Sequence, residues 1–466
     1  MRRLVLLHTN DIHGRTEALA RIATLVEEAR EEAAGAAVLY VDAGDVEDTT
    51  NRLSNMTKGT ALHRLLDAAG CQAVAVGNGT VIRYGPEPLV EQAAATSYPH
   101  LAANLWRDGA VVPGAQPRAL LHVEGVCVGL IGLTPANWRS LYENAFGVEL
   151  PEEAPLVREH AAALRAEGAD VVILLSHLGL DRDRELAVEV GGELDLIIGG
   201  HSHSLLAEGE VVAGVPIAQA GEFGEQLGRI ELSLDERGAR VTSLRVQPVP
   251  QELRPHPALL GEQRTIEGEL AAWLETVVGE LDGPLELAHD RECSATAFIA
   301  DVIRERMGAD VAVALPGTSF VSGLPAGPVT RGALYDACPS PGVCAAARMT
   351  GAQLRDLLAR GLDPELAADR PQALRGSPRG LLHLSGAEIR GGELLVAGSP
   401  LDPGARYEVA GSDWEIDTYG GYAREEWALD VRFDGTTIMR EAVEEHLGRH
   451  GRIEAPAPRL YGGLEP

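Results

Sequence analysis

The chain has 466 residues, 45% of them hydrophobic, and its 69 acidic against 40 basic residues give a formal net charge of −29. This charge argues against a nucleic acid polymer as a partner, because the surface repels polyanions. Five cysteines do not indicate a disulfide framework in so long a chain, and the apolar run Leu4–Leu7 is too short for a signal peptide or membrane span, so we expect a cytoplasmic protein without membrane association.

The first half of the chain, from Leu4 to about Gln247, alternates short apolar runs with amphipathic stretches of helical period. Apolar runs that end in polar or glycine residues are typical of buried strands with helices between them. The pattern therefore predicts a layered α/β domain over residues 1–255. The strand-like runs, with the residues that end them, are 4–7, 37–45, 73–77, 126–134, 170–179 and 194–203; the helix-like stretches are 18–34, 61–70 and 158–168.

A second domain is expected to follow a linker. Prolines cluster between Pro248 and Pro257, and the next stretch is acidic and helix-like, so residues 256–280 are predicted to form a linker helix. A length above that of one typical core supports the division. The second domain is expected over 281–466, with strand-like runs at 311–315 and 394–398 and helix-like stretches at 296–308 and 350–362.

The segment Gly77-Asn78-Gly79 ends one of the apolar runs. Three small residues in a row predict a tight turn with a left-handed backbone. Asn78 would then lie at the carboxyl end of a strand, where open α/β sheets place their chemistry.

Polar side chains follow several of the predicted strands and would meet at one edge of the sheet. Carboxylate, imidazole and amide oxygen are together the ligands expected for two divalent transition metals with one bridging aspartate. Such a pair of ions binds a phosphoryl oxygen and activates a hydroxide as nucleophile. The candidate ligands are Asp11, His13, Asp45, Asn78, His177, His201 and His203.

At these residues the chain resembles the 5'-nucleotidase family of calcineurin-like metallophosphoesterases. The resemblance rests on LLHTNDIHGR, VDAGD, VGN, SHLGL and GGHSHS, and on the second-half segments ECSATAFIADVIRERMGADVAVA, GLPAGPVTRGALYDACP and MTGAQLRDLLARGL. It covers nearly the whole chain. It implies a four-layered α/β/β/α metallophosphoesterase domain followed by an α+β 5'-nucleotidase C-terminal domain that binds substrate.

The resemblance also assigns the ligands to two ions, with zinc or manganese the usual metals. It implies that one ion is held by Asp11, His13, Asp45 and His203, and the other by Asp45, Asn78, His177 and His201. We expect Asn78 and His177 to be catalytic residues as well as ligands. The implied substrates are nucleoside monophosphates, nucleotide sugars or related small phosphorylated molecules, attacked in line by a metal-bound hydroxide.

The chain departs from the family pattern directly after Asn78. There the family has a histidine, oriented by a nearby aspartate, whereas this chain has Gly79. An acid/base dyad of this kind typically raises the reaction rate about 10²–10⁴-fold, and this chain lacks it. We therefore expect slow hydrolysis of ordinary 5'-nucleotides and better relative activity on esters or anhydrides with good leaving groups. Arg83 could replace some positive charge, and His63, His100 or His122 could approach the site, although surface or packing roles are the alternative for these histidines.

The second domain departs from the family at the substrate loops. Pro316-Gly317-Thr318-Ser319-Phe320 replaces a loop that carries Asn-Gly-Gly and a phosphate-binding arginine, and the glycine-rich aromatic motif is reduced to Tyr419-Gly420-Gly421-Tyr422. Phe320, Tyr419 and Tyr422 could stack on a base or could be core aromatics. Together with Arg83 they are the candidate substrate-binding residues.

Two functions therefore remain open. The first is a dinuclear metal-dependent phosphoester hydrolase with impaired or altered activity. The second is an inactive metal-dependent protein that binds or senses a nucleotide. A phosphate-binding loop of the GxxxxGK type and a GxSxG serine motif do not occur in the sequence.

Overall fold

The computed structural model describes residues 2–33, 35–137, 139–340, 342–371, 374 and 376–461. The chain forms two compact units, Met1–Gly268 and Glu269–Pro466. The border falls within α9 (Pro257–Leu274), which lies inside the segment predicted as a linker helix. The helix ends before residue 280 because Val277–Leu281 forms strand β15, which pairs with β17 (Gly327–Thr330).

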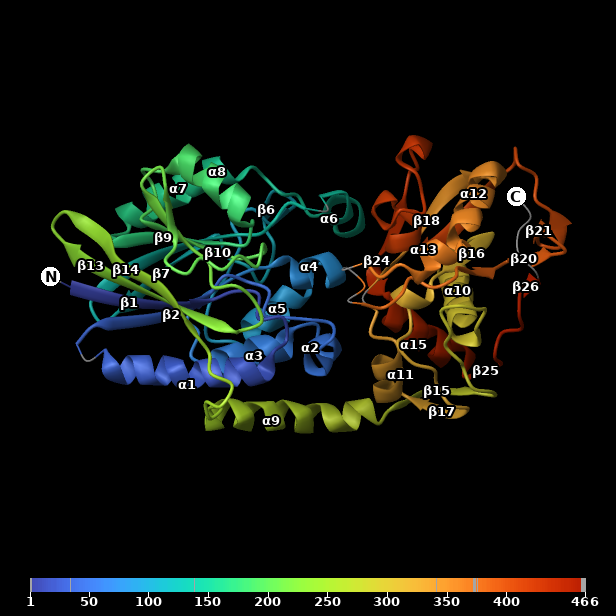
Figure 1. Cartoon of the computed structure of the whole chain (residues 1–466), viewed down its shortest axis with the longest axis horizontal. Coiled ribbons are helices and arrows are strands. Elements are labelled where there is room, and N and C mark those ends of the chain that lie inside the picture. Colours follow the sequence, from blue (N-terminus) through green and yellow to red (C-terminus); the bar gives the residue numbers. More distant parts are fainter. Residues whose placement is uncertain are drawn as a thin grey trace. The chain divides into compact units, whose positions relative to one another are not determined.

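The first unit is built on two six-stranded sheets (Figure 1). The first has the order β14 (Gly238–Pro248), β13 (Gln226–Asp235), β1 (Arg2–Thr9), β2 (Ala37–Asp42), β3 (Val74–Ala75), β4 (His100–Leu101). The second has the order β11 (Glu210–Val212), β12 (Val215–Ala218), β10 (Leu196–Gly199), β9 (Val171–Ser176), β8 (Val126–Leu133), β7 (Arg118–Val123). In each sheet the central strands are parallel, so their carboxyl ends lie at one edge.

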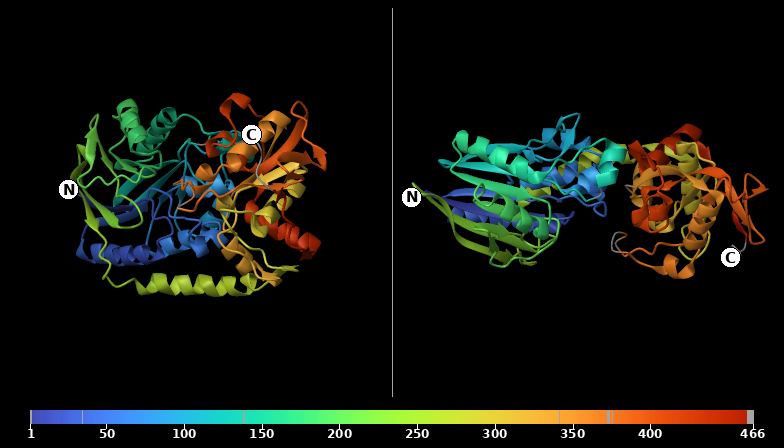
Figure 2. Two further views of the ribbon diagram at one scale, coloured as in Figure 1. Left: turned by 45° about the vertical axis from the view of Figure 1, so that its right-hand side comes forward. Right: turned by 90° about the horizontal axis from the view of Figure 1, so that it is seen from above.

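Four layers result, because each sheet buries both faces. Leu6 and Val41 of the first sheet share one apolar core with Leu130 and Ile173 of the second. The other face of the second sheet packs against α7 (Glu153–Ala166) and α8 (Leu180–Val190). Figures 1 and 2 show α1 (Thr16–Glu32) and α3 (Thr60–Ala68) on the outer side of the first sheet. The expected α/β/β/α order is confirmed.

Short elements complete the first unit. They are the helices α2 (Arg52–Met56), α4 (Asn78–Tyr84), α5 (Pro88–Ala94) and α6 (Arg139–Phe146), and the ribbon β5 (Trp106–Arg107) with β6 (Ala110–Val111). None of the helices that the structure describes is both long and apolar enough to span a membrane.

The second unit is α+β, as expected. Its main sheet has the order β19 (His383–Ser385), β16 (Val311–Ala314), β23 (Arg406–Ser412), β18 (Val343–Thr350), β24 (Arg432–Ile438). A smaller sheet joins β17 and β15 to β25 (Arg452–Ile453), and another joins β22 (Ser399–Pro400), β21 (Glu393–Val396), β20 (Ala387–Arg390) and β26 (Leu460–Tyr461). The helices are α10 (Ser294–Met307), α11 (Arg331–Ala337), α12 (Gly351–Gly361), α13 (Pro364–Ala368), α14 (Asp413–Ile416) and α15 (Met439–His450).

Candidate metal centre

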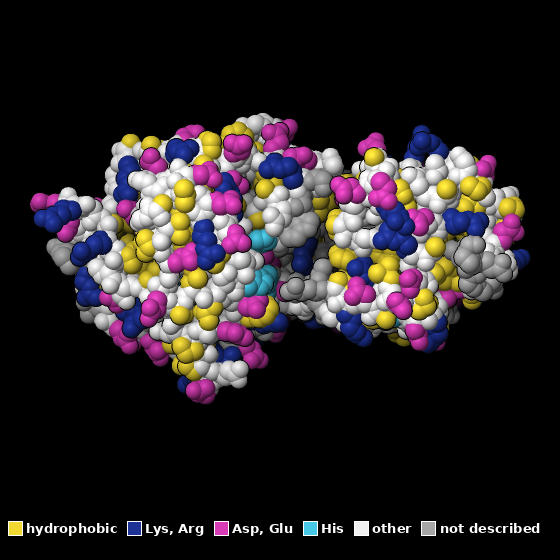
Figure 3. Space-filling view, turned by 45° about the horizontal axis from the view of Figure 1, so that its top comes forward, with side chains coloured by type: hydrophobic (Ala, Val, Ile, Leu, Met, Phe, Trp, Pro, Cys, Tyr) yellow, Lys and Arg dark blue, Asp and Glu magenta, His cyan; other side chains and the backbone are white. Residues whose placement is uncertain are grey.

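The predicted ligands all lie in loops or a helix start that follow parallel strands of the first unit. Asp11 and His13 follow β1, and Asp45 follows β2. His177 directly follows β9 of the other sheet, where His201 and His203 follow β10. The two sheets pack face to face, so these loops meet at one edge of the double layer. Figure 3 shows histidine side chains gathered at one place on the surface.

The backbone is strained at this edge. Positive φ angles are uncommon for residues other than glycine, and such conformations cluster at functional sites. Five of the predicted ligands have them: Asp11 (51°), His13 (47°), Asp45 (57°), His201 (72°) and His203 (55°). Such bends turn successive side chains of one loop toward the same point.

The side chains converge at distances that suit a metal ion. Tetrahedral bonds of the length zinc makes to nitrogen and oxygen separate two ligand atoms by about 3.3 Å. The Nε2 atom of His203 lies 3.3 Å from Asp11 Oδ1 and 3.1 Å from His13 Nε2. The Nε2 atom of His177 lies 3.4 Å from Asp45 Oδ2 and 3.8 Å from Asp11 Oδ1. Two groups of donors result, Asp11–His13–His203 and Asp11–Asp45–His177.

Three of the predicted ligands have a buried polar atom without a hydrogen-bond partner among the described residues. Buried polar atoms are nearly always hydrogen-bonded, so an exception requires an explanation. Asp11 Oδ1, His177 Nε2 and Asn78 Oδ1 are all buried and make no hydrogen bond among the described residues. Each belongs to a predicted ligand, and the donor set therefore fits divalent cations. Asp11 belongs to both groups in this arrangement, and the bridging role of Asp45 stays a prediction.

Hydrogen bonds from neighbouring residues set the orientation of the imidazoles. The Nδ1 atom of His177 donates to the carbonyl of Ala43 at 2.6 Å, which leaves Nε2 free to bind a cation. The Nδ1 atom of His203 likewise donates to the carboxylate of Glu222. Sequence reasoning missed Glu222, although a carboxylate that follows the apolar run of β12 was the available signal.

Asp11 is fixed from two sides. The side chain of Asn10 and the backbone N–H of His201 donate to its Oδ2, at 2.8 and 2.9 Å, so Oδ1 alone points at the histidines. Asn10 in turn accepts the N–H of Ala220 and donates to the carbonyl of Gly221. The Nδ2 atom of Asn137 lies 3.0 Å from Nε2 of His201. Sequence reasoning missed Asn137 as well.

The electrostatics of the site favour a cation. Burial lowers the pKa of His177, but the carboxylates of Asp45 and Asp11 outweigh burial and raise this pKa to about 10. Burial raises the pKa of Asp45, yet His177 more than reverses the effect and holds it well below its ordinary value. Without an ion, a proton on His177 therefore compensates the carboxylates, and a divalent cation would replace that positive charge.

The turn expected at Gly77-Asn78-Gly79 is not present. Gly77 is extended (φ −77°, ψ −178°), and Asn78 begins α4. The glycine at position 77 is needed for a close approach, because a Cβ there would lie 2.0 Å from Asp45 Oδ1. The N–H of Gly79 donates to that same oxygen at 2.7 Å, and this bond brings Asn78 to the edge of the site. The prediction of a left-handed backbone was wrong because the first turn of a helix also suits small residues.

The predicted substrate-binding residues have different surroundings. Arg83, on α4, donates to Thr49 Oγ1 at 2.6 Å in the loop that follows Asp45. Phe320 is 2% exposed and Tyr422 is fully buried in the second unit, which suits core aromatics, and a stacking role for either ring stays a prediction. Tyr419 is 39% exposed, and its hydroxyl donates to Asp413. Among the three aromatics, only Tyr419 presents a ring to solvent within its unit.

The histidines considered as substitutes for the missing dyad have packing or surface positions. His63 is buried between Glu47, 2.8 Å from its Nε2, and the Tyr98 hydroxyl, 3.0 Å from its Nδ1. His100 is 1% exposed, and its Nε2 lies 3.0 Å from Thr96 Oγ1. His122 lies on β7 and contacts the Cys127 thiol. The structure thus favours a packing role for the buried His63 and His100 and a surface role for the exposed His122.

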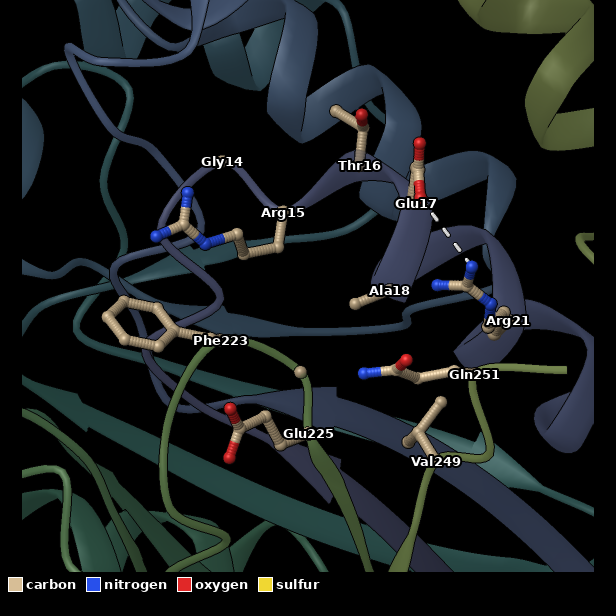
Figure 4. A pocket seen from close by; sticks show the side chains of 11 residues that line it. Gly14, Arg15, Thr16, Glu17, Ala18, Arg21, Phe223, Glu225, Val249 and Gln251 are labelled. Carbon is tan, nitrogen blue, oxygen red and sulfur yellow. Dashed lines mark ion pairs between the residues drawn. The ribbon is translucent and has the colours of Figure 1, made fainter. Parts of the chain in front are cut away.

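A cavity of about 660 Å³ borders the loop that carries His13 (Figure 4). Phe223 lines it, and its ring lies 5.9 Å from the ring of His13 and 6.2 Å from that of His203. The Arg15 guanidinium lies 4.6 Å from the centroid of the same ring. Phe223 therefore packs against two predicted ligands while it also forms part of the cavity wall.

Asp183, in the first turn of α8, leads to a prediction about stability. Its side chain is fully buried, it accepts a bond from Ser176 Oγ, and burial raises its pKa to about 7. The folded protein keeps a proton that the unfolded chain releases near pH 4, so the free energy of unfolding should fall as pH rises from 4 to 7, by up to roughly 4 kcal/mol. Asp183→Asn mimics the protonated carboxyl. Urea unfolding at pH 5 and pH 8 should show a smaller pH dependence in this variant, and equal dependence in both proteins would contradict the assignment.

Two family models match the chain. Residues 4–205 match the calcineurin-like phosphoesterase family, and residues 277–424 match the 5'-nucleotidase C-terminal domain. The uncharacterized metallophosphoesterase YunD of Bacillus subtilis is 28% identical over 398 residues, which are 83% of this chain and 84% of that protein. The 5'-nucleotidase of Diplobatis ommata is 28% identical over 344 residues. The aligned part covers 64% of this chain and 58% of the Diplobatis protein.

Solved structures share the fold. The putative 5'-nucleotidase of Staphylococcus aureus has a TM-score of 0.64 at 16% identity, with full coverage of both chains. The NAD nucleotidase of Haemophilus influenzae has a TM-score of 0.63 at 17% identity, covering 100% of this chain and 99% of that one. At these identities the likeness establishes the two-domain architecture alone.

Proposed function

Because the chain belongs to the 5'-nucleotidase family of calcineurin-like metallophosphoesterases, we propose that it hydrolyses phosphoesters or phosphoanhydrides of nucleotides and related small molecules at a dinuclear metal centre. The observation that carries the proposal is the convergence of unpartnered buried ligand atoms, Asp11 Oδ1, His177 Nε2 and Asn78 Oδ1, on one strained edge. Buried polar atoms without a partner call for an explanation, and a bound cation supplies one at this place.

The donor set indicates which ions the centre would hold. Imidazole nitrogens combined with carboxylate and amide oxygens suit zinc or manganese, and two such ions supply Lewis-acid polarisation of the phosphoryl group and an activated water. The residues of the chain do the positioning. Ala43, Glu222 and Asn10 fix the tautomer or orientation of the ligands, while the exposure of His203 (35%) against that of His177 (0%) indicates the side from which substrate enters.

Gly79 determines which substrates suit the centre. The position of a Cβ on Gly79 lies 3.0 Å from Asp45 Oδ1 and 3.7 Å from Glu47 Oε2, so an acid/base side chain at this point would stand beside the ligands. The chain has none at that position. An alkoxide leaving group needs a proton, whereas a phenolate or phosphate leaves without one. We therefore expect activated esters and anhydrides to be hydrolysed faster than 5'-nucleoside monophosphates.

A second candidate function is supported by other residues. Loss of the dyad at Gly79, with all seven candidate ligands retained, favours a protein that binds a phosphorylated ligand without turning it over. This alternative keeps the same ligand set and differs only in catalysis.

The two functions are separated by steady-state turnover with manganese or zinc, with His177→Ala as the blank. Inorganic phosphate is measured for AMP, ADP and p-nitrophenyl phosphate, and the nucleoside monophosphate product is measured for a nucleotide sugar and a cyclic nucleotide. The hydrolase account predicts turnover above the blank, greatest on p-nitrophenyl phosphate or ADP. If no substrate exceeds the blank while nucleotide still binds in equilibrium dialysis, the binding protein is the correct description.

A further inference from the structure

A second group of metal-ligand side chains lies in the other unit, on the facing surfaces of two helices. Glu305 belongs to the last turn of α10, and His446 and His450 are four residues apart on α15. Residues at this spacing lie one turn apart on the same face of a helix, the arrangement by which two histidines bind one zinc ion. Their three donor atoms all lie within 4.8 Å of one another.

The distances repeat those of the first centre. The Nδ1 atom of His446 lies 3.1 Å from Glu305 Oε2, and the Nε2 atom of His450 lies 2.9 Å from the same oxygen. These values are close to the spacing of about 3.3 Å between ligand atoms of tetrahedral zinc. The two rings are also close together, with centroids 4.3 Å apart. A small outward movement of each side chain would therefore admit an ion.

The ion pair with Arg449 does not block this position. Its guanidinium contacts Oε1 of Glu305, whereas both imidazoles face Oε2. One carboxylate oxygen thus stays bound to the arginine, which orients the group, while the other remains available as a ligand. Such support of a ligand by a neighbouring donor is usual in metal sites.

One of the ligands is well ordered by packing. His446 is 12% exposed and its ring meets that of the buried Phe298 edge-on, 5.6 Å between centroids. His450 and Glu305 are 43% and 37% exposed, which gives an ion access from solvent.

We propose that Glu305, His446 and His450 form a zinc site that joins α10 to α15. Two imidazoles and one carboxylate select zinc over calcium or magnesium, and water completes the tetrahedron. The ion links the last turns of two helices that are far apart in the sequence, since Glu305 and His450 are separated by 145 positions. Zinc therefore stabilises the folded second unit by binding it in preference to the unfolded chain. This role is independent of any hydrolysis in the first unit.

The test compares zinc binding by the full-length protein and by His450→Ala. Protein stripped with a chelator is dialysed against micromolar zinc, and the bound metal is counted. His450→Ala is expected to bind one equivalent per chain less, with an affinity loss of at least about 100-fold at this position. The result is the difference between the zinc contents of the two proteins. It therefore does not depend on how many ions the first unit holds or on whether the first unit is active.

One variant serves as the control. His122→Ala removes an exposed histidine from another part of the chain and should bind as much zinc as the parent protein. Cobalt should give the visible absorption of a tetrahedral ion that is lost in His450→Ala alone. Equal zinc counts and equal zinc-induced shifts of Tm in the parent protein and His450→Ala would overturn the proposal and leave the cluster as a hydrogen-bonded ion pair network.

Discussion

Asp45→Asn is expected to lower phosphate release by about 1,000-fold or more. The metal centre is expected to contribute several kcal/mol of transition-state stabilisation, and each 1.36 kcal/mol corresponds to a factor of ten in rate. Asp45 is 4% exposed, and its Oδ2 faces His177 at 3.4 Å. An asparagine retains a carbonyl oxygen that can accept the Gly79 N–H, so the fold should survive while the charge is lost.

The matched control for this variant is Asp42→Asn. Asp42 is equally buried and precedes the same loop, but its two oxygens accept the Gly44 N–H and the Thr9 hydroxyl, and it belongs to neither donor group. Burial raises its pKa to about 7, so the neutral amide is a mild change. Steady-state rates and metal counts on both variants should show loss in Asp45→Asn only. Equal rates in the two variants would remove Asp45 from the site.

Gly79→His is expected to raise the rate on AMP by about 10²–10⁴-fold, the usual contribution of a positioned acid/base group. The new Cβ would lie 3.0 Å from Asp45 Oδ1, which is close but requires a shift of only a few tenths of an ångström. The backbone at this position is helical, so a side chain brings no φ strain. The gain should be much smaller on p-nitrophenyl phosphate, whose leaving group needs little help.

Gly79→Ala separates the imidazole from the steric change, because it adds the Cβ alone. We expect this variant to show no gain on AMP. If Gly79→His and Gly79→Ala hydrolyse AMP at the same rate while both retain their metal, proton donation does not limit the reaction, and the account of the leaving-group preference is wrong.

The convergence of Asp11, Asp45 and His177 could be predicted from sequence because each closely follows an apolar strand. A parallel sheet brings strand ends together whatever the loops do. Their role as metal ligands stays a prediction. The four-layered order came from the family resemblance, since periodicity distinguishes helices from strands but not which faces of two sheets meet.

Contacts between distant residues could not be predicted in this way. Glu222 orients His203 only because β12 and β10 are neighbours in one sheet, and Phe320 and Tyr422 are buried by packing that no local pattern reveals. The cluster of Glu305 with His446 and His450 was missed for the same reason, although the two histidines at helical spacing were visible in the sequence.

The central claim is that metal ions at the first centre carry out hydrolysis. The most direct test is phosphate release from p-nitrophenyl phosphate by chelator-stripped protein while manganese is titrated. The account predicts negligible turnover without metal, a rise that saturates near two ions per chain, and no rise in Asp45→Asn. Turnover that is unchanged by stripping, or absent at every concentration of manganese and zinc, would contradict it.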